Sequence, residues 1–76
     1  MKLPNKLFNY GESIISKFPI ILKILEQKKY LTIYELYEHV ITHFNDITEF
    51  IDTVECLYAL NKIEYNNKLR RIYYVV

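Results

Sequence analysis

Residues 46–75 read DITEFIDTVECLYALNKIEYNNKLRRIYYV, and this stretch decides the fold. Residues 46–61 have the apolar spacing of an amphipathic helix. The residues that follow are mixed apolar and polar around Asn66-Asn67, a dipeptide that favours a tight turn. We therefore expect a helix that leads directly into a β-hairpin.

Two more helix patterns precede this stretch. The first begins near Ser13, but Pro19 interrupts it, and a proline inside a helix removes a backbone hydrogen bond. We expect this helix to be kinked or split near Pro19. The second begins after Thr32, whose spacing from Glu35 predicts a capping box. Residues 30–31, just before this cap, are a candidate short strand that pairs with the hairpin.

The order of these elements is helix, helix, helix, hairpin, which is the order of a winged-helix domain. We predict an α+β fold that is mostly helical, in a single winged-helix domain over residues 1–76. Residues 1–11 form an N-terminal arm, residues 12–61 the helical part, and residues 62–76 the hairpin of the wing. A chain of this size is near the lower limit for one core without staples.

The apolar pattern also predicts how these elements pack. The inner face of the 46–61 helix is expected to be broad, comprising Ile47, Phe50, Ile51, Val54, Leu57, Tyr58 and Leu60. If the hairpin turn has only two residues, Asn66-Asn67, then Leu69 and Ile72 lie in one strand and point to opposite faces of it. A β-bulge around Arg70-Arg71 would reconcile them.

The polar positions of the 46–61 helix argue against DNA reading. In a DNA-reading winged helix, this third helix needs basic or amide side chains in the major groove. Here it carries Asp46, Glu49, Asp52 and Glu55, with no Lys or Arg before Lys62. The net charge of +1 gives no overall attraction to nucleic acid or to an anionic membrane. This charge pattern favours a protein-binding part.

Tyrosine is abundant in this chain, with eight in 76 residues. So small a domain cannot bury all of them, and tyrosine is favoured at interfaces because it joins an apolar ring to a polar tip. The alternatives are tyrosines that line the edge of a small core and tyrosines that contact a partner. The candidate protein-interaction residues are Leu3, Leu7, Phe8, Tyr34, Tyr37, Tyr73 and Tyr74.

Basic residues gather on the hairpin, at Lys62, Lys68, Arg70 and Arg71. A basic wing can follow a phosphate backbone. It can also be a solvated rim that prevents edge-to-edge aggregation, or a contact for an acidic partner. These four residues are candidates for nucleic-acid or acidic-partner contact, and we leave the three interpretations open.

Catalytic and metal-binding patterns are weak. Glu35, His39 and His43 share one stripe of the second helix, but the glutamate that a zinc protease needs after its first histidine is replaced by Val40. Cys56 lies among apolar residues and is expected to fill space in the core. We predict no catalytic residue, no metal and no cofactor, and a chain that is not an enzyme.

The expected compartment is the cytoplasm. One cysteine cannot form an internal disulfide, which fits a reducing environment. Residues 1–11 lack the apolar run of a secretion signal. The most apolar stretch, 14–25, contains Lys17 and Lys23 and is too short to span a bilayer. We expect no membrane contact.

The chain resembles the middle component 6 family of bacterial ABC-three component (ABC-3C) systems over nearly its full length. The resemblance is carried by segments without an active-site signature, at residues 3–6 (LPNK), 12–15 (ESII), 32–36 (TIYEL), 50–63 (FIDTVECLYALNKI) and 68–71 (KLRR). It implies a winged-helix adaptor subunit of a Lamassu-like antiphage defence system. The implied partners are an ABC ATPase similar to structural-maintenance-of-chromosomes (SMC) or Rad50 proteins and an effector, often a nuclease.

The leading hypothesis is therefore a non-catalytic adaptor that links such an ATPase to its effector, with nonspecific DNA contact by the wing inside the complex. The main alternative is a small winged-helix DNA-binding transcriptional regulator. A third is an inhibitor or antitoxin-like partner, which would use the same protein-binding surface.

Overall fold

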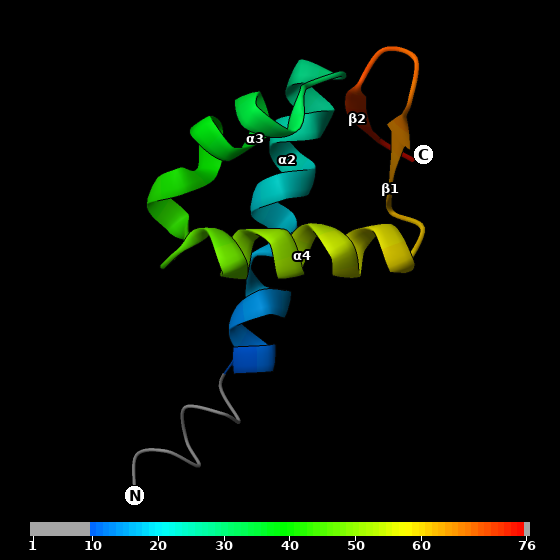
Figure 1. Cartoon of the computed structure of the whole chain (residues 1–76). Helices are drawn as coiled ribbons and strands as arrows, with labels where there is room; N and C mark the ends of the chain where they lie inside the picture. The colour runs from blue at the N-terminus through cyan, green and yellow to red at the C-terminus, as the bar shows by residue number, and fades with distance from the viewer. Residues whose placement is uncertain (1–9, 76) are drawn as a thin grey trace, which may run out of the picture.

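The computed structural model describes residues 10–75 of the protein. Residues 10–16 are helical, and the named elements follow in the order α2 (Phe18–Lys28), α3 (Ile33–Val40), the short 3-10 helix η1 (Ile41–His43), α4 (Ile47–Ala59), β1 (Ile63–Asn66) and β2 (Arg71–Tyr74). Figure 1 shows α4 crossing α2, with the hairpin beside the C-terminal end of α4. This is the predicted winged-helix fold, α+β and mostly helical.

The first helix is split close to Pro19, as predicted. Residues 10–16 are helical, Lys17 is a turn, and α2 begins at Phe18 with the proline in its first turn. A proline is tolerated there because the first N–H groups of a helix have no intrahelical partner. The Lys17 carbonyl accepts from the N–H groups of Ile20 and Ile21, at 3.1 and 3.3 Å, which joins the two pieces.

Side-chain caps fix the starts of α3 and α4. The predicted capping box is present: Thr32 Oγ1 accepts from the Glu35 N–H at 3.1 Å, and the Thr32 N–H donates to the Glu35 carboxylate at 2.9 Å. The Thr32 N–H, followed by the Thr32 side chain, lowers the pKa of the Glu35 carboxyl group. At α4, Asp46 Oδ1 accepts from the Glu49 N–H at 2.9 Å. Local sequence thus sets both helix starts.

The sheet has two antiparallel strands and a bridge. Tyr65 pairs with Ile72, and Ile72 is bridged on its other side by Leu31, which exchanges both backbone hydrogen bonds with it. The expected short strand before α3 is therefore present as this single bridge. Because successive residues of a strand face opposite ways, the Tyr65 N–H and C=O point away from β2. Within residues 10–75, no strand pairs with that outer edge of β1.

The turn between the strands is longer than predicted. Asn66 pairs with Arg71, so residues 67–70 form the loop, and the two-residue turn at Asn66-Asn67 with a bulge around Arg70-Arg71 is wrong. The Asn66 side chain explains the difference, since its Oδ1 accepts from the Leu69 N–H at 2.9 Å. Arg70 closes the loop with a φ of 57°. Leu69 lies in the loop and need not keep the phase of either strand.

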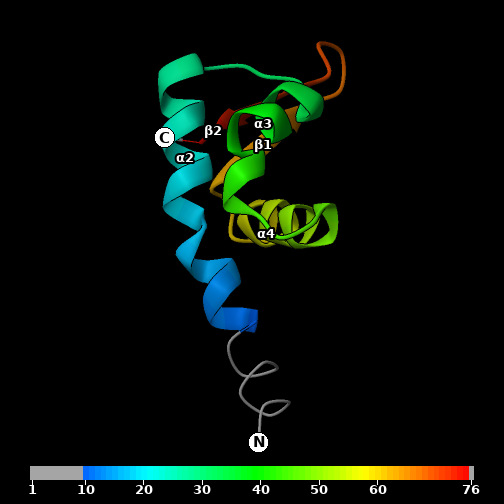
Figure 2. The ribbon, with the colours of Figure 1, turned by 90° about the vertical axis from the view of Figure 1, so that its left-hand side faces the viewer.

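The core lies where the helices meet the sheet. Figure 2 shows α4 end-on below α3 and the strands, with α2 beside them. Phe50 is at its centre, with the Tyr37 ring 4.8 Å and the Phe44 ring 5.5 Å from its own. The helices α2, α3 and α4, both strands and the residues Leu31 and Phe44 contribute, through Ile21, Leu25, Leu31, Leu36, Val40, Phe44, Phe50, Leu57, Ile63 and Ile72. No helix within residues 10–75 is long and apolar enough to cross a membrane.

The buried face of α4 differs from the predicted inner face. The structure buries Glu49, Phe50, Thr53 and Leu57. Four of the residues predicted to face the core are exposed, namely Ile47, Ile51, Tyr58 and Leu60. The polar members of the buried face are satisfied, since the Thr53 hydroxyl donates to the Glu49 carbonyl at 2.8 Å. The helix is therefore rotated so that part of its apolar surface faces outward.

Candidate protein-interaction surface

The tyrosines predicted to contact a partner differ in how much of each side chain is exposed to solvent. Tyr34, in the first turn of α3, is 80% exposed. Tyr37 is half-buried against the core, and so is Tyr74. Tyr34 alone of these three presents most of its ring to a partner. The remaining apolar candidates, Leu3, Leu7 and Phe8, lie outside the described residues.

Tyr73 has partners on the outer face of the hairpin. Its hydroxyl donates to the Glu64 carboxylate across the strand pair at 3.1 Å, which raises the pKa of Tyr73. The Tyr30 ring lies 5.7 Å from the Tyr73 ring. Tyr73 is therefore half-buried, and its hydroxyl group links the two strands of the hairpin.

The basic residues of the hairpin do not act as one patch. Lys62, Lys68 and Arg70 are exposed, at the entry to β1 and in the loop. Arg71 is half-buried, and its guanidinium donates to the Leu69 carbonyl at 2.9 Å. Three cations are thus left facing solvent, and the fourth holds the loop closed.

Glu49 is a structural anchor, which the spacing of the sequence did not reveal. Its side chain is only 3% exposed, and it accepts from the Asn45 N–H and the Ser13 hydroxyl, both at 2.8 Å. The Lys17 ammonium lies 3.6 Å from the same carboxylate. The Asn45 N–H, then Ser13 and Lys17, lower the pKa of Glu49. This network ties the first helical piece to α4, so Glu49 contributes no charge to the outer surface.

Two of the other three carboxylates of α4 also have internal roles. Asp46 caps the helix. Asp52 accepts a hydrogen bond from the Tyr10 hydroxyl, which raises the pKa of Tyr10 to about 12. Glu55 has no hydrogen bond or ion pair within residues 10–75. Much of the acidity that argued against DNA is therefore used in folding, and the outer surface of α4 must be judged by its other residues.

That outer surface is apolar along one line. Ile47, Ile51 and Tyr58 are 55%, 37% and 58% exposed, and Val54 between them is half-buried. Their spacing of four, three and four residues places them on one side of the helix. We call these four residues the α4 seam. Large apolar side chains aligned on a small domain are a candidate interaction site.

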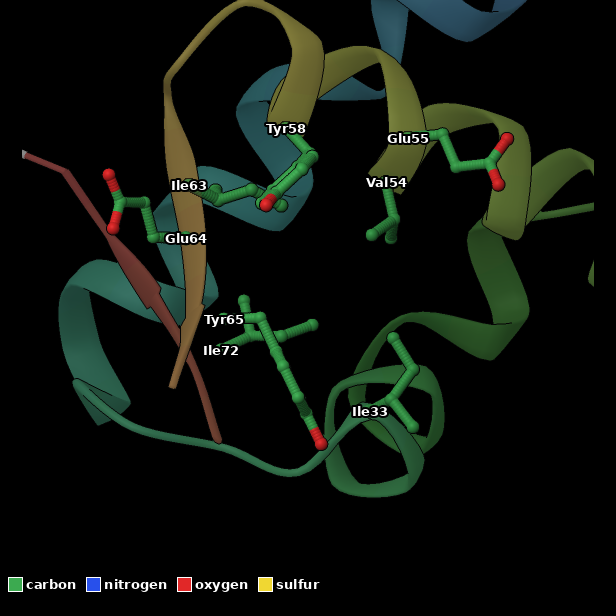
Figure 3. A pocket seen from close by; sticks show the side chains of 8 residues that line it. All are labelled: Ile33, Val54, Glu55, Tyr58, Ile63, Glu64, Tyr65 and Ile72. Carbon is green, nitrogen blue, oxygen red and sulfur yellow. The ribbon is translucent and has the colours of Figure 1, made fainter. Parts of the chain in front are cut away.

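A pocket of about 540 Å³ continues the α4 seam toward the hairpin. It lies between α4, β1 and the start of α3, as Figure 3 shows, and Val54 points into it. Its walls are mostly hydrocarbon, from Ile33, Val54, Tyr58, Ile63, Tyr65 and Ile72. Glu55 and Glu64 are its charged lining residues, and in Figure 3 both carboxylates point away from the interior.

A second pocket, of about 490 Å³, lies on the other side of α4. Ile14 and Ile15 of the first helical piece face Cys56 and Ala59 of α4 across it. Cys56 is exposed, so the prediction that it fills space in the core is wrong. Cys56 instead lines this second pocket, beside the first helical piece.

The described residues offer no metal-binding cluster. No three side chains of His, Cys, Asp or Glu within residues 10–75 lie close enough to hold an ion. His39 and His43 are exposed, on α3 and η1. The chemistry that this surface supports is apolar contact, with carboxylates at the rim.

The chain matches the model of a known protein family. The family model described as ABC-three component (ABC-3C) system Middle Component 7 matches residues 3–72. This confirms the resemblance to a middle component of such systems, but the matching family is Middle Component 7 and not the predicted component 6. No curated protein and no solved structure matches the chain.

Proposed function

This chain belongs to the Middle Component 7 family of ABC-three component (ABC-3C) systems, and we propose that it serves such a system as a non-catalytic adaptor. Membership implies a role in an ABC-three component defence system. The adaptor binds an SMC/Rad50-like ABC ATPase and links it to an effector subunit, often a nuclease. We place the complex in the cytoplasm and assign it to the Lamassu-like antiphage type.

The observation that carries this proposal is the α4 seam. A winged helix that reads base edges needs hydrogen-bonding side chains on the outer surface of this helix. Here Ile47, Ile51 and Tyr58 occupy that surface, and no Lys or Arg lies within α4. Burial of such side chains against a protein is favourable, at about 25 cal/mol for each Å² of apolar area removed from water. The surface is suited to a protein partner.

A non-catalytic role agrees with where the reactive side chains lie. His39, His43 and Cys56 are exposed and belong to three different elements. A nucleophile needs a base within hydrogen-bond reach, and no hydrogen bond joins these groups within residues 10–75.

Contact with DNA has a smaller place in the proposal. Lys68 and Arg70 in the hairpin loop, with Lys62 at its base, can approach phosphates when the ATPase holds DNA nearby. Such contact is electrostatic and independent of sequence.

Co-production with the neighbouring gene products tests the adaptor role. We expect the chain to elute with the ATPase in size-exclusion chromatography, and the effector to join the same peak. A chain that elutes alone as a monomer, with both proteins present and folded, would overturn the proposal.

The rival transcriptional regulator makes a different prediction. Fluorescence anisotropy of labelled DNA duplexes, at two salt concentrations, measures binding by the isolated chain. Tight binding that depends on sequence, and that weakens in Arg70→Ala, would favour the regulator. Weak binding that is lost at the higher salt concentration fits phosphate contact by the wing alone.

A further inference from the structure

We propose that the α4 seam is the seat of an amphipathic helix of the partner, whose apolar stripe is flanked by Lys or Arg. This inference rests on the proposed adaptor function and specifies the chemistry of the partner. The spacing of the seam is the first argument. Ile47, Ile51, Val54 and Tyr58 repeat at four, three and four residues, which is the a/d spacing by which one helix packs along another.

The pocket beside the seam is the second argument. Val54 and Tyr58 belong both to the seam and to the wall of the pocket, so the two form one continuous surface. A helix laid along α4 can therefore place its own large apolar side chains into the pocket, between Tyr65 and Ile33. Such pockets receive the anchoring residues that supply most of the binding energy of an interface.

The charge around the seam decides which helix fits. Glu55 lies in the same helix, next to Val54, and has no partner within residues 10–75. Neither the seam nor the pocket lining includes a Lys, Arg or His. A helix with basic flanking residues would pair with Glu55, as flanking charges do in coiled coils.

The same charge disfavours a second copy of this chain. A symmetric dimer places the same patch of both copies in contact. Two seams packed on each other would bring both Glu55 carboxylates to one interface, and α4 has no Lys or Arg to separate them. Like charges in that position oppose association.

Site-specific photo-crosslinking tests the inference in the whole complex. A photoreactive phenylalanine analogue replaces Ile51 in the full chain, which is co-produced with the ATPase and the effector, and mass spectrometry locates the crosslink. The matched control carries the analogue at Ile41, which is 46% exposed on η1 and is not a member of the α4 seam. We expect position 51 to crosslink to a helix with apolar residues at heptad spacing and Lys or Arg beside them, and position 41 to give no such product.

Two substitutions give the energetic test. Ile51→Asp should weaken binding at least about fivefold, because a residue central to an interface contributes more than 1 kcal/mol. Glu55→Lys should weaken binding about threefold, and the effect should shrink at high salt, because exposed ion pairs are weak and screened. Ile41→Asp serves as the control and should bind like the parent. Melting curves of each variant, measured without its partners, test whether it is folded.

The possible outcomes separate the two proposals. A complex that forms, but whose crosslinks from position 51 reach a strand, a loop or a second copy of this chain, overturns the seam and leaves the adaptor function standing. Unchanged binding of Ile51→Asp does the same. Failure to form any complex overturns the adaptor function, and the inference falls with it.

Discussion

Replacing Glu49 tests whether its buried carboxylate ties the first helical piece, through Ser13 and Lys17, to α4. Glu49→Ala removes the acceptor of the Asn45 N–H and the Ser13 hydroxyl and leaves Lys17 without its ion pair. Breaking a buried pair costs about 3–5 kcal/mol. Because the Lys17 side chain keeps 17% of its exposure and can turn to water, we expect the lower end, about 3 kcal/mol. For a domain of this size, that corresponds to a fall in Tm of about 12–24 °C.

The assay is thermal unfolding followed by far-UV circular dichroism at neutral pH. Glu49→Gln keeps an acceptor but loses the charge, so it should cost about 1.5 kcal/mol, the lower value for a hydrogen bond to a charged group. Glu55→Gln is the matched control, since Glu55 is exposed on the same helix, and its effect should stay within about 0.5 kcal/mol. Equal melting temperatures for Glu49→Gln and Glu55→Gln would refute the anchoring role.

The acid side of the stability curve gives a second test of the same group. The pKa of Glu49 is lower in the folded chain than its ordinary value of 4.5. A depressed pKa means that the stabilisation is complete above the unfolded value and is lost as the pH falls through the folded one. Unfolding in urea should therefore become easier for the parent below about pH 4.5, while Glu49→Gln should show a shallower dependence. Glu35 titrates in the same direction in both proteins, so the difference between them reports Glu49.

Three further predictions concern α4. Asp52→Asn should return the pKa of Tyr10 from about 12 toward its ordinary value of 10.0, followed by NMR of ring-labelled tyrosine; an unchanged titration would contradict the hydrogen bond. Leu57→Ala should cost about 2–5 kcal/mol because Leu57 is fully buried, whereas Ile51→Asp should cost less because Ile51 is 37% exposed, and the reverse order in melting experiments would mean that the rotation of α4 is wrong. Cys56 should react with a maleimide in the native state as fast as a free thiol, and protection until unfolding would show it to be buried.

The features that could be predicted from sequence are those with local causes. The box between Thr32 and Glu35 closes within one turn, and Pro19 disturbs only its own neighbourhood. The rotation of α4 has no local cause. Apolar residues cover more than one side of that helix, and the choice depends on Ser13 and Lys17, which reach Glu49 from more than thirty residues away.

The sequence predicts a protein-binding surface, from the conflict between the element order and the charge of the third helix, and this stays a prediction. The sequence does not predict that the α4 seam faces outward. Ile47 and Ile51 were assigned to the core, however, because periodicity alone cannot tell a buried apolar face from one that is covered by another protein. The predicted length of the hairpin loop was also wrong, because that length depends on a hydrogen bond from the Leu69 N–H to the Asn66 side chain.

The outer edge of β1, which no other strand covers within residues 10–75, has a practical consequence for handling the purified protein. The Tyr65 N–H and C=O face outward next to an apolar pocket, which is the arrangement from which strand-to-strand aggregation starts. Because the strand has only four residues, the hazard should appear mainly in concentrated stocks. Producing the chain together with its proposed partners should therefore improve its yield and shelf life.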